Sequence, residues 1–432
     1  MTVSTGIETP VEETRVALGR PLRVALVYGR EEASRRAVVH LALASGASHL
    51  RHSVKPRFQR TTMHSLFPRG RLGYTAMRRS AKAWMIAAAA AGGAIALERF
   101  FLAGSRYRGR RSDHFDGHRF YNADPGRQSE ESFLKWQLTR QRGTWRDRFD
   151  VPFGPPPPAR VGDGDLRVTF INHATTLLQL DGINILTDPV WSERVSPVPF
   201  AGPRRHRPPG IRFEDLPAID LVLVSHNHYD HLDIDTLRRL QQRHAPRIVV
   251  PLGNVALLHR HGIRNATELD WWESEGRVTA VPARHFSARG LSDRNRTLWC
   301  GFVITSAAGN VYFAGDTGWG PHFQEIGDRF APMRLALLPI GAYLPRWFMH
   351  SVHIDPEQAV DAHFALRAEA SVAIHFGTFA LGDDGDEEPI WDLKQAIDQK
   401  QHPRFWILAH GEGRDLPPIV RSERGRTVSS TT

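Results

Sequence analysis

From residue 166 onward the chain is divided into short apolar runs of the kind that form β-strands. The runs in the first half are LRVTFI, TLLQL, INILTD, LVLVS and RIVVP, and those in the second half are RVTAVPA, GFVIT, VYFAG, LALLPI and SVAIH. Helical patterns lie between some of them, at residues 235–243 and 356–366. Two groups of strands with intervening helices predict a layered α/β body whose helices lie on the outside.

Four of these runs are followed closely by residue types that bind metals. The residues are His226, His228, Asp230 and His231 after LVLVS, His285 after RVTAVPA, Asp316 after VYFAG, and His375 after SVAI. Because strand ends in one sheet system lie along a common edge, we expect these loops to converge on one place. A polar cluster at the rim of a core needs a partner that apolar surroundings cannot supply.

Seven such residues are more than one tetrahedral metal ion needs. They suit two ions that share a bridging aspartate and a bridging water. Cys300 is the only cysteine, so the site uses imidazole and carboxylate rather than thiolate. This donor set favours two zinc ions per chain, with iron or manganese as alternatives. The competing interpretation is a hydrogen-bonded histidine cluster without metal.

The net charge of +10 is unevenly distributed along the chain. Residues 1–112 carry 20 Lys and Arg against 6 Asp and Glu, whereas the remaining residues carry 36 against 40. The basicity therefore belongs to the N-terminal region, and the rest of the chain has no general attraction for polyphosphates. This distribution argues against a nucleic-acid partner.

The N-terminal region allows two interpretations. Residues 1–76 form either a disordered basic extension or a stretch that is not translated, if synthesis begins at Met77 or Met63. From Met77 the sequence MRRSAKAWMIAAAAAGGAIAL has a basic start and an apolar run at residues 83–97, so residues 77–112 resemble a signal or membrane anchor. The run is short for a membrane-spanning helix, and an Ala-rich helix packed on the domain is the alternative. We expect a membrane-associated protein, with the cytoplasmic or periplasmic face left open.

Residues 113–160 read as an N-terminal arm with one helix around residues 130–142. The sequence PFGPPPPARVGDGD ends this helical pattern, because proline and glycine interrupt helices. We assign residues 161–415 to the main domain and residues 416–432 to a flexible tail.

The motif SHNHYDHLD, together with the later histidines, resembles the metallo-β-lactamase superfamily. That resemblance implies an αββα four-layer sandwich with a dinuclear site. Longer strings, among them NHATTLLQLDGINILTDPVW, FAGDTGWGPHF and VHIDPEQAVDAHFALRAEASVAIHFGTFAL, resemble the N-acyl-phosphatidylethanolamine-hydrolysing phospholipase D group within it. The likeness runs from about residue 112 to about residue 414.

The resemblance assigns the ligands residue by residue. It implies that one zinc ion is held by His226, His228 and His285, the other by Asp230, His231 and His375, and that Asp316 bridges them. His353 in SVHIDPEQ matches a histidine that the family places beside the substrate phosphate. The local sequence agrees, because Asp355, Pro356 and Gln358 form the pattern of a capping box, and a helix N-terminus favours an anion. The alternative is a capping-loop histidine without substrate contact.

Other candidates have weaker support. Asp188 in LTDP either orients a zinc-binding histidine or is a turn aspartate before proline. His173 in NHAT either lines the pocket or is structural. The loop PIGAYLPRWFMH places Tyr343 and Trp347 near the matched residues, where they suit acyl chains, the bilayer interface or the core. Leu344 in this loop departs from the acidic residue expected in the animal enzymes.

We therefore predict a dinuclear zinc phosphodiesterase that releases N-acylethanolamine and leaves phosphatidic acid. Asp230 or a zinc-bound water protonates the leaving group. The expected partner is a phospholipid at a membrane surface, and the family also includes homodimers. The main alternative is a lactonase or small-molecule phosphoesterase like the ascorbate-6-phosphate lactonase relatives. A further alternative, from another class, is a non-catalytic membrane-attached binding module with a structural metal.

Overall fold

The computed structural model describes residues 103–122 and 133–419. The predicted extension at residues 1–76, the apolar run at 83–97 and most of the predicted tail lie outside these residues. Within the two described stretches, no helix has both the length and the apolar character needed to cross a bilayer.

The first of two seven-stranded sheets has the strand order β14-β1-β2-β3-β4-β5-β6. Strands β1, β2 and β3 form an antiparallel meander, and β3 to β6 run parallel to one another. The strands span Leu166–Asn172 (β1), Thr175–Leu180 (β2), Ile183–Thr187 (β3), Leu221–Leu223 (β4), Arg247–Pro251 (β5), Ala266–Leu269 (β6) and Gly413–Leu416 (β14).

The second sheet has the order β13-β12-β11-β10-β9-β8-β7. Its strands β10 to β13 are parallel, whereas β7, β8 and β9 pair in antiparallel fashion. The strands span Ser274–Glu275 (β7), Val278–Val281 (β8), Gly301–Ile304 (β9), Asn310–Phe313 (β10), Met333–Pro339 (β11), Ser371–Ile374 (β12) and Phe405–Trp406 (β13).

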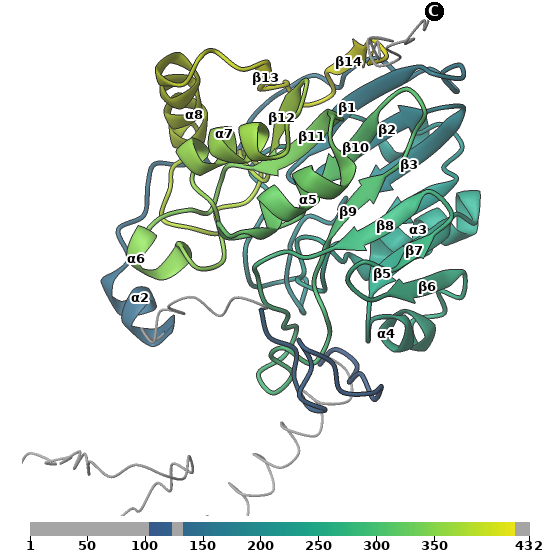
Figure 1. Cartoon of the computed structure of the whole chain (residues 1–432). Helices are drawn as coiled ribbons and strands as arrows, with labels where there is room; N and C mark the ends of the chain where they lie inside the picture. Colours follow the sequence, from purple (N-terminus) through teal and green to yellow (C-terminus); the bar gives the residue numbers. More distant parts are fainter. Residues whose placement is uncertain (1–102, 123–132, 420–432) are drawn as a thin grey trace, which may run out of the picture. The chain divides into compact units, whose positions relative to one another are not determined.

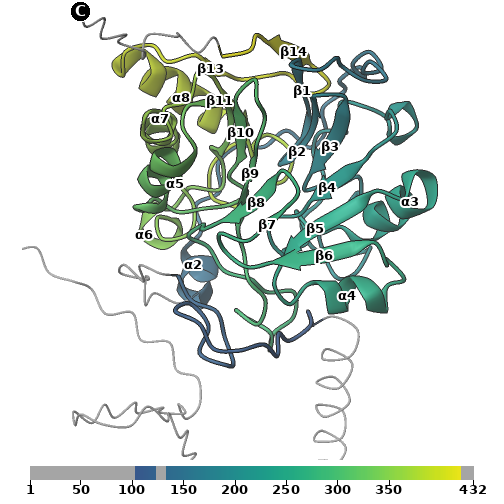
Figure 2. The same cartoon turned by 45° about the vertical axis from the view of Figure 1, so that its right-hand side comes forward.

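Helices cover the outer face of each sheet, with α3 and α4 on one side and α5, α7 and α8 on the other (Figure 2). They span Ile234–His244 (α3), Val255–Arg260 (α4), His322–Phe330 (α5), Pro356–Ala365 (α7) and Glu388–Gln399 (α8). The αββα sandwich predicted from the sequence is confirmed. The helices predicted at residues 235–243 and 356–366 are present as α3 and α7, with ends that agree to within one residue, and the helix predicted around residues 130–142 is the shorter α2 (Phe133–Thr139).

The apolar side chains explain this layering. In one core cluster Leu237 and Leu240 of α3 pack with Val222 and Ile248 of the first sheet. The larger cluster joins the inner faces of both sheets and extends to α5, α7 and α8. Burial on both faces explains why these strands read as nearly continuous apolar runs rather than as alternating ones.

The N-terminal arm packs against the domain through α2 (Phe133–Thr139), which lies beside the short helix α6 (Arg346–Met349) (Figure 1). The ring of Trp136 on α2 stacks on Phe348 of α6, with centroids 5.0 Å apart. A short 3-10 turn, η2 (Phe213–Asp215), precedes β4. The first residues of the predicted tail, 416–419, pack on the domain, because Leu416 closes β14 and the amide of Ile419 donates to the carbonyl of Ala308.

The strand directions decide where the site lies. Because β2 is antiparallel to both β1 and β3, strands β1, β3 and β4 point the same way. In the second sheet β8 and β10 flank β9 in antiparallel fashion, so both point the same way as β12. The carboxyl ends of these six strands carry the seven predicted ligands together with His173 and Asp188.

Candidate metal centre

A first cluster consists of His226, His228 and His285, whose ligand atoms all lie within 4.8 Å of one another. The Nδ1 atom of His228 lies 2.8 Å from Nε2 of His226 and 3.3 Å from Nε2 of His285. Burial lowers the pKa of His285 to about 3 and that of His228 to about 4. Burial also holds the pKa of His226 well below its usual value, so the three imidazoles are neutral at pH 7, which is the form that binds a metal ion.

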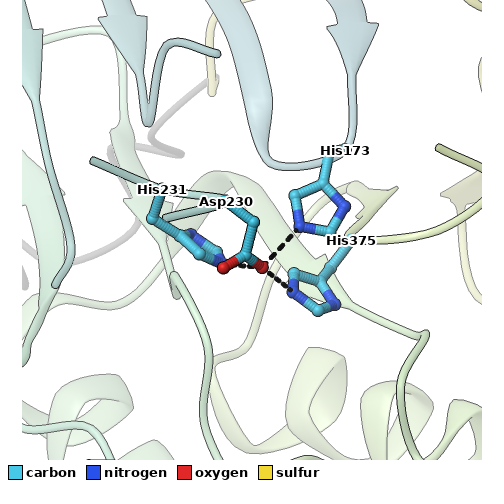
Figure 3. A group of neighbouring side chains, drawn as sticks. All are labelled: His173, Asp230, His231 and His375. Atoms are coloured by element: carbon cyan, nitrogen blue, oxygen red, sulfur yellow. Dashed lines mark hydrogen bonds and ion pairs between the residues drawn. The ribbon is translucent and has the colours of Figure 1, made fainter. Parts of the chain in front are cut away.

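A second cluster consists of His173, Asp230, His231 and His375 (Figure 3). Asp230 is its centre, because its Oδ2 atom lies 3.0 Å from Nε2 of His173, 3.2 Å from Nε2 of His231 and 3.5 Å from Nε2 of His375. All four residues are buried. The sequence left His173 as either a pocket residue or a structural one, and the structure places it against the predicted ligand Asp230.

Asp316 lies between the two clusters. Its Oδ2 atom is 3.2 Å from Nε2 of His231 and 3.0 Å from Nε2 of His375 in the second cluster. The same oxygen is 3.8 Å from Nε2 of His285 in the first cluster. All seven residues that the sequence singled out as ligands thus meet at one edge, with Asp316 in the place expected of a bridge.

Unpartnered atoms and charge show that these residues fit metal ions. The buried Oδ1 of Asp316 has no hydrogen-bond partner, and the Nε2 atoms of His231 and His375 lie 3.0–3.2 Å from Oδ2 of Asp316 without the geometry of a hydrogen bond. Burial opposes a positive charge on His375, but Asp316 and Asp230 outweigh it and raise its pKa to about 9. The same carboxylates raise the pKa of His231 well above its usual value, again against burial. The site thus attracts positive charge, and its imidazole and carboxylate donors suit zinc, iron or manganese.

Neighbouring groups orient the ligand rings. Asp188 accepts a hydrogen bond from Nδ1 of His231 at 2.5 Å, and it also accepts from the amide and hydroxyl of Ser225 at 2.7 and 2.6 Å. The Nδ1 atom of His285 donates to the carbonyl of Val352 at 2.9 Å. Such contacts direct the other ring nitrogen toward the site. For Asp188 the geometry favours the orienting role over that of a simple turn residue.

Three site residues have the left-handed backbone conformation that side chains other than glycine rarely adopt. The φ angles are 45° at His173, 32° at Asp188 and 61° at His375. Just before Asp316, Gly315 also has a positive φ of 60°, and a Cβ atom there would lie 2.4 Å from Cβ of Ser225. Strain of this kind persists where the surroundings hold the residue in place, and it concentrates at functional sites.

His353 lies beside both clusters. Its Nδ1 atom is 4.0 Å from Oδ2 of Asp316 and has no hydrogen-bond partner, although the side chain is buried. The predicted capping box is present, because the Asp355 carboxylate accepts from the Gln358 amide at 2.8 Å and the Gln358 side chain accepts from the Asp355 amide. The start of α7 therefore holds His353 at the edge of the centre.

The two aromatic candidates of the 339–350 loop have other neighbours. Tyr343 is buried, and its hydroxyl donates to the carboxylate of Asp392 on α8. Trp347 is 37% exposed on α6, and the ammonium of Lys135 lies 4.8 Å from its ring centroid. The Tyr343 side chain thus points toward α8, and the Trp347 ring contacts the N-terminal arm.

Asn122 of the arm is a site residue that sequence reasoning missed. Its Oδ1 accepts from the amide of His285 and its Nδ2 donates to the carbonyl of the same residue, both at 3.2 Å. Oδ1 also accepts from the indole of Trp299 at 3.0 Å. An asparagine in a stretch without regular structure carries no signal for such a role, since the contact joins residues 163 positions apart.

Comparisons with known proteins show the family to which this chain belongs. Residues 183–376 match the family described as Beta-lactamase superfamily domain. N-acyl-phosphatidylethanolamine-hydrolyzing phospholipase D 1 of Caenorhabditis elegans is 42% identical over 256 residues, covering 55% of this chain and 72% of that protein. An uncharacterized protein of Mycobacterium tuberculosis is 40% identical over 293 residues, covering 65% of this chain and 78% of that protein. Among solved structures, Igni18, a metallo hydrolase of Ignicoccus hospitalis, has a TM-score of 0.46 at 23% identity and covers 58% of this chain and 98% of its own.

Proposed function

The chain is a metal-dependent hydrolase of the metallo-β-lactamase superfamily, and from this premise we propose that it cleaves the phosphodiester of N-acyl-phosphatidylethanolamine-like lipids. The products would be an N-acylethanolamine and phosphatidic acid. The observation that carries the proposal is Asp316, whose carboxylate touches the residues of both histidine clusters. Such an arrangement suits two cations that act on one phosphoryl group.

The proposed ligand assignment follows the two clusters. His226, His228 and His285 would hold one ion, Asp230, His231 and His375 the other, and Asp316 would contact both. When bound, a pair of divalent cations supplies Lewis acidity, which lowers the pKa of water and neutralises charge on a phosphoryl group. Zinc is the proposed metal because imidazole and carboxylate ligands suit it.

Asp230 is placed to handle a proton. Burial disfavours its charge, but His231, His173 and His375 outweigh that effect and hold the pKa of this carboxyl well below its usual value. The carboxylate is therefore ionised at pH 7 but is a weak base, so in the proposal Asp230 takes up the proton only of a water whose own pKa bound cations would lower. The same proton then passes to the oxygen of the departing alcohol, so that the charge balances.

His353 supports an anionic substrate group. Burial lowers its pKa to about 3, so the ring is neutral at pH 7 and one nitrogen carries a hydrogen. Its unpartnered Nδ1 faces Asp316 across 4.0 Å. In the proposal the ring donates a hydrogen bond to a phosphate oxygen, just ahead of the N-terminus of α7, where negative charge is favoured.

The substrate also determines where the enzyme works. The relative from C. elegans is named for hydrolysis of N-acyl-phosphatidylethanolamine, and a two-chain phospholipid of this kind is presented by a membrane. We therefore propose that the site meets its substrate at a membrane surface.

The test uses purified protein loaded with zinc and vesicles that contain N-acyl-phosphatidylethanolamine. We expect phosphatidate to form in the wild type and its rate to fall about 100-fold to 1,000-fold in His353→Ala, as for loss of a transition-state hydrogen bond. His363→Ala is the matched control, because His363 is also a buried histidine but lies in the last turn of α7, at the end away from His353, and bonds to Ser371. Turnover of a soluble lactone or small phosphoester without any phosphatidate would overturn the substrate assignment.

A further inference from the structure

We propose that Arg289 is a positioning residue that fastens the two ligand-bearing loops of the metal centre to each other. One loop is the 226–232 segment, which carries His226, His228, Asp230 and His231. The other is the 285–293 loop, which begins with the ligand His285 and contains Arg289. This inference rests on the proposed metal centre and not on the phospholipid assignment.

Arg289 contacts the 226–232 segment at both ends. Its Nη1 atom donates to the carbonyl of Asn227 and to the carbonyl of Leu232, both at 2.8 Å. Asn227 stands between His226 and His228, and Leu232 directly follows His231. One guanidinium nitrogen thus links the two ends of the segment that bears four of the seven proposed ligands.

The middle of the same segment packs on the guanidinium. The Cζ atom of Arg289 lies 3.8 Å from the ring centroid of Tyr229, which precedes the ligand Asp230. Tyr229 in turn packs on the apolar cluster of Val190, Val195 and Phe379. The ring is therefore held between the arginine and this cluster, which restricts the backbone at Asp230.

The 285–293 loop is braced so that Arg289 keeps this position. The Asp293 carboxylate accepts from the amides of Arg289, at 3.1 and 3.2 Å, and of Gly290 at 2.8 Å. It also accepts from the amide of Gly104 in the arm at 2.6 Å. A Cβ atom at Gly104 would lie 2.9 Å from Nδ2 of Asn227 and 3.0 Å from Oδ2 of Asp293. Three segments distant in sequence thus meet around one arginine.

The chemistry of arginine suits this role. The planar guanidinium presents donors in its plane and a flat face for an aromatic ring, so it can bond two carbonyls and stack at once. Neither contact reaches a metal ligand's side chain directly. The effect on the centre therefore passes through the backbone of the 226–232 segment, and groups that orient ligands in this way commonly change metal affinity 10-fold to 100-fold.

The test compares Arg289→Met with Arg334→Met. Arg334 is a buried arginine that likewise donates to backbone carbonyls, those of Gly164, Leu416 and Pro417, but it lies at the start of β11, the end of the strand opposite the metal centre. We expect both variants to unfold at a lower temperature in the metal-free state. Only Arg289→Met should also bind zinc more weakly, by about 10-fold to 100-fold, in competition with a chromophoric chelator.

Arg289→Lys adds a graded comparison, because lysine keeps the charge and a donor but not the planar fork. We expect its zinc affinity to lie between those of the wild type and Arg289→Met. Wild-type affinity in Arg289→Met, or equal weakening in Arg334→Met, would overturn the proposal. If Arg289→Met does not fold, wild-type affinity in Arg289→Lys has the same consequence. A wild type that binds no zinc would instead contradict the metal centre itself.

Discussion

At the scale of single residues, the metal-free centre holds protons where cations would bind. His231 and His375 have raised pKa values because the carboxylates of Asp316 and Asp230 lie within 3.5 Å of their Nε2 atoms. His226, by contrast, has a pKa well below its usual value, because burial is the largest influence on it. Imidazoles only a few ångströms apart therefore differ in charge, according to their distance from the two carboxylates.

This charge pattern predicts that metal binding depends on pH. The pKa of His375 is raised from 6.5 to about 9, so the ring is protonated at pH 7 and must lose its proton to bind an ion. Apparent zinc affinity should rise between pH 6.5 and 9, by up to about tenfold per pH unit for each proton released. Without metal, the stability that this charged ring contributes is full below pH 6.5 and is lost as the pH rises through 9.

Titration calorimetry in buffers of different ionisation enthalpy measures the protons released. We expect at least one proton per chain at pH 7. Zinc uptake without proton release, together with an affinity that does not change from pH 6.5 to 9, would contradict the raised pKa of His375.

At the scale of elements, each strand that ends at the site is followed by a turn or loop that carries site residues. The turn after β1 places His173, and the loops after β4, β8, β10 and β12 place the seven proposed ligands. Helix α7 differs, because it positions His353 through its start rather than through a strand end. Arg346 of α6 adds a further contact, since its Nη1 donates to the carbonyl of His353 at 3.0 Å.

The start of α7 can be tested by Asp355→Ala. Loss of the cap removes the acceptor for the Gln358 amide and should lower the free energy of unfolding by about 1 kcal/mol. Because His353 lies two residues before the cap, we also expect the KM for the phosphodiester to rise while metal content stays unchanged. Urea unfolding and metal analysis measure the two effects. Glu357→Ala removes a charge from the same helical turn without removing the cap, so equal losses in that control would contradict the role of the cap.

At the scale of the whole domain, the candidate centre lies where the two sheets meet. The first sheet contributes His226, His228, Asp230 and His231, and the second contributes His285, Asp316 and His375. Bound cations would therefore link the two halves of the sandwich through coordination bonds at the edge of the apolar core.

Removal of metal should therefore lower the stability of the whole domain. A ligand at 100 times its Kd stabilises the folded state by about 2.7 kcal/mol per site, so we expect chelation to lower the Tm by several degrees. Asp316→Ala should show a much smaller metal-dependent shift, whereas Asp328→Ala, on an exposed turn of α5, should keep the wild-type shift. Calorimetry with and without chelator measures both. A metal-dependent shift of wild-type size in Asp316→Ala would contradict the bridging position.

Much of this protein could be predicted from local patterns in the chain. Apolar runs indicate strands, helical periodicity indicates α3 and α7, and the Asp-Pro-x-Gln pattern indicates the capping box, because each depends on neighbouring residues alone. The spacing of histidine and aspartate behind the strands also identifies the seven residues that meet at the edge of the sandwich. These features were all accessible from the sequence.

The contacts between distant segments were decided only by the tertiary structure. Asn122 bonds to the backbone of His285, and Arg289 joins two loops. The ring of His173 contacts Asp230, which lies 57 positions away in the chain. Tyr343 is directed toward α8 by its bond to Asp392. The physical reason is that burial, hydrogen-bond partners and pKa shifts depend on which groups packing brings together, whereas secondary structure depends largely on residues adjacent in the chain.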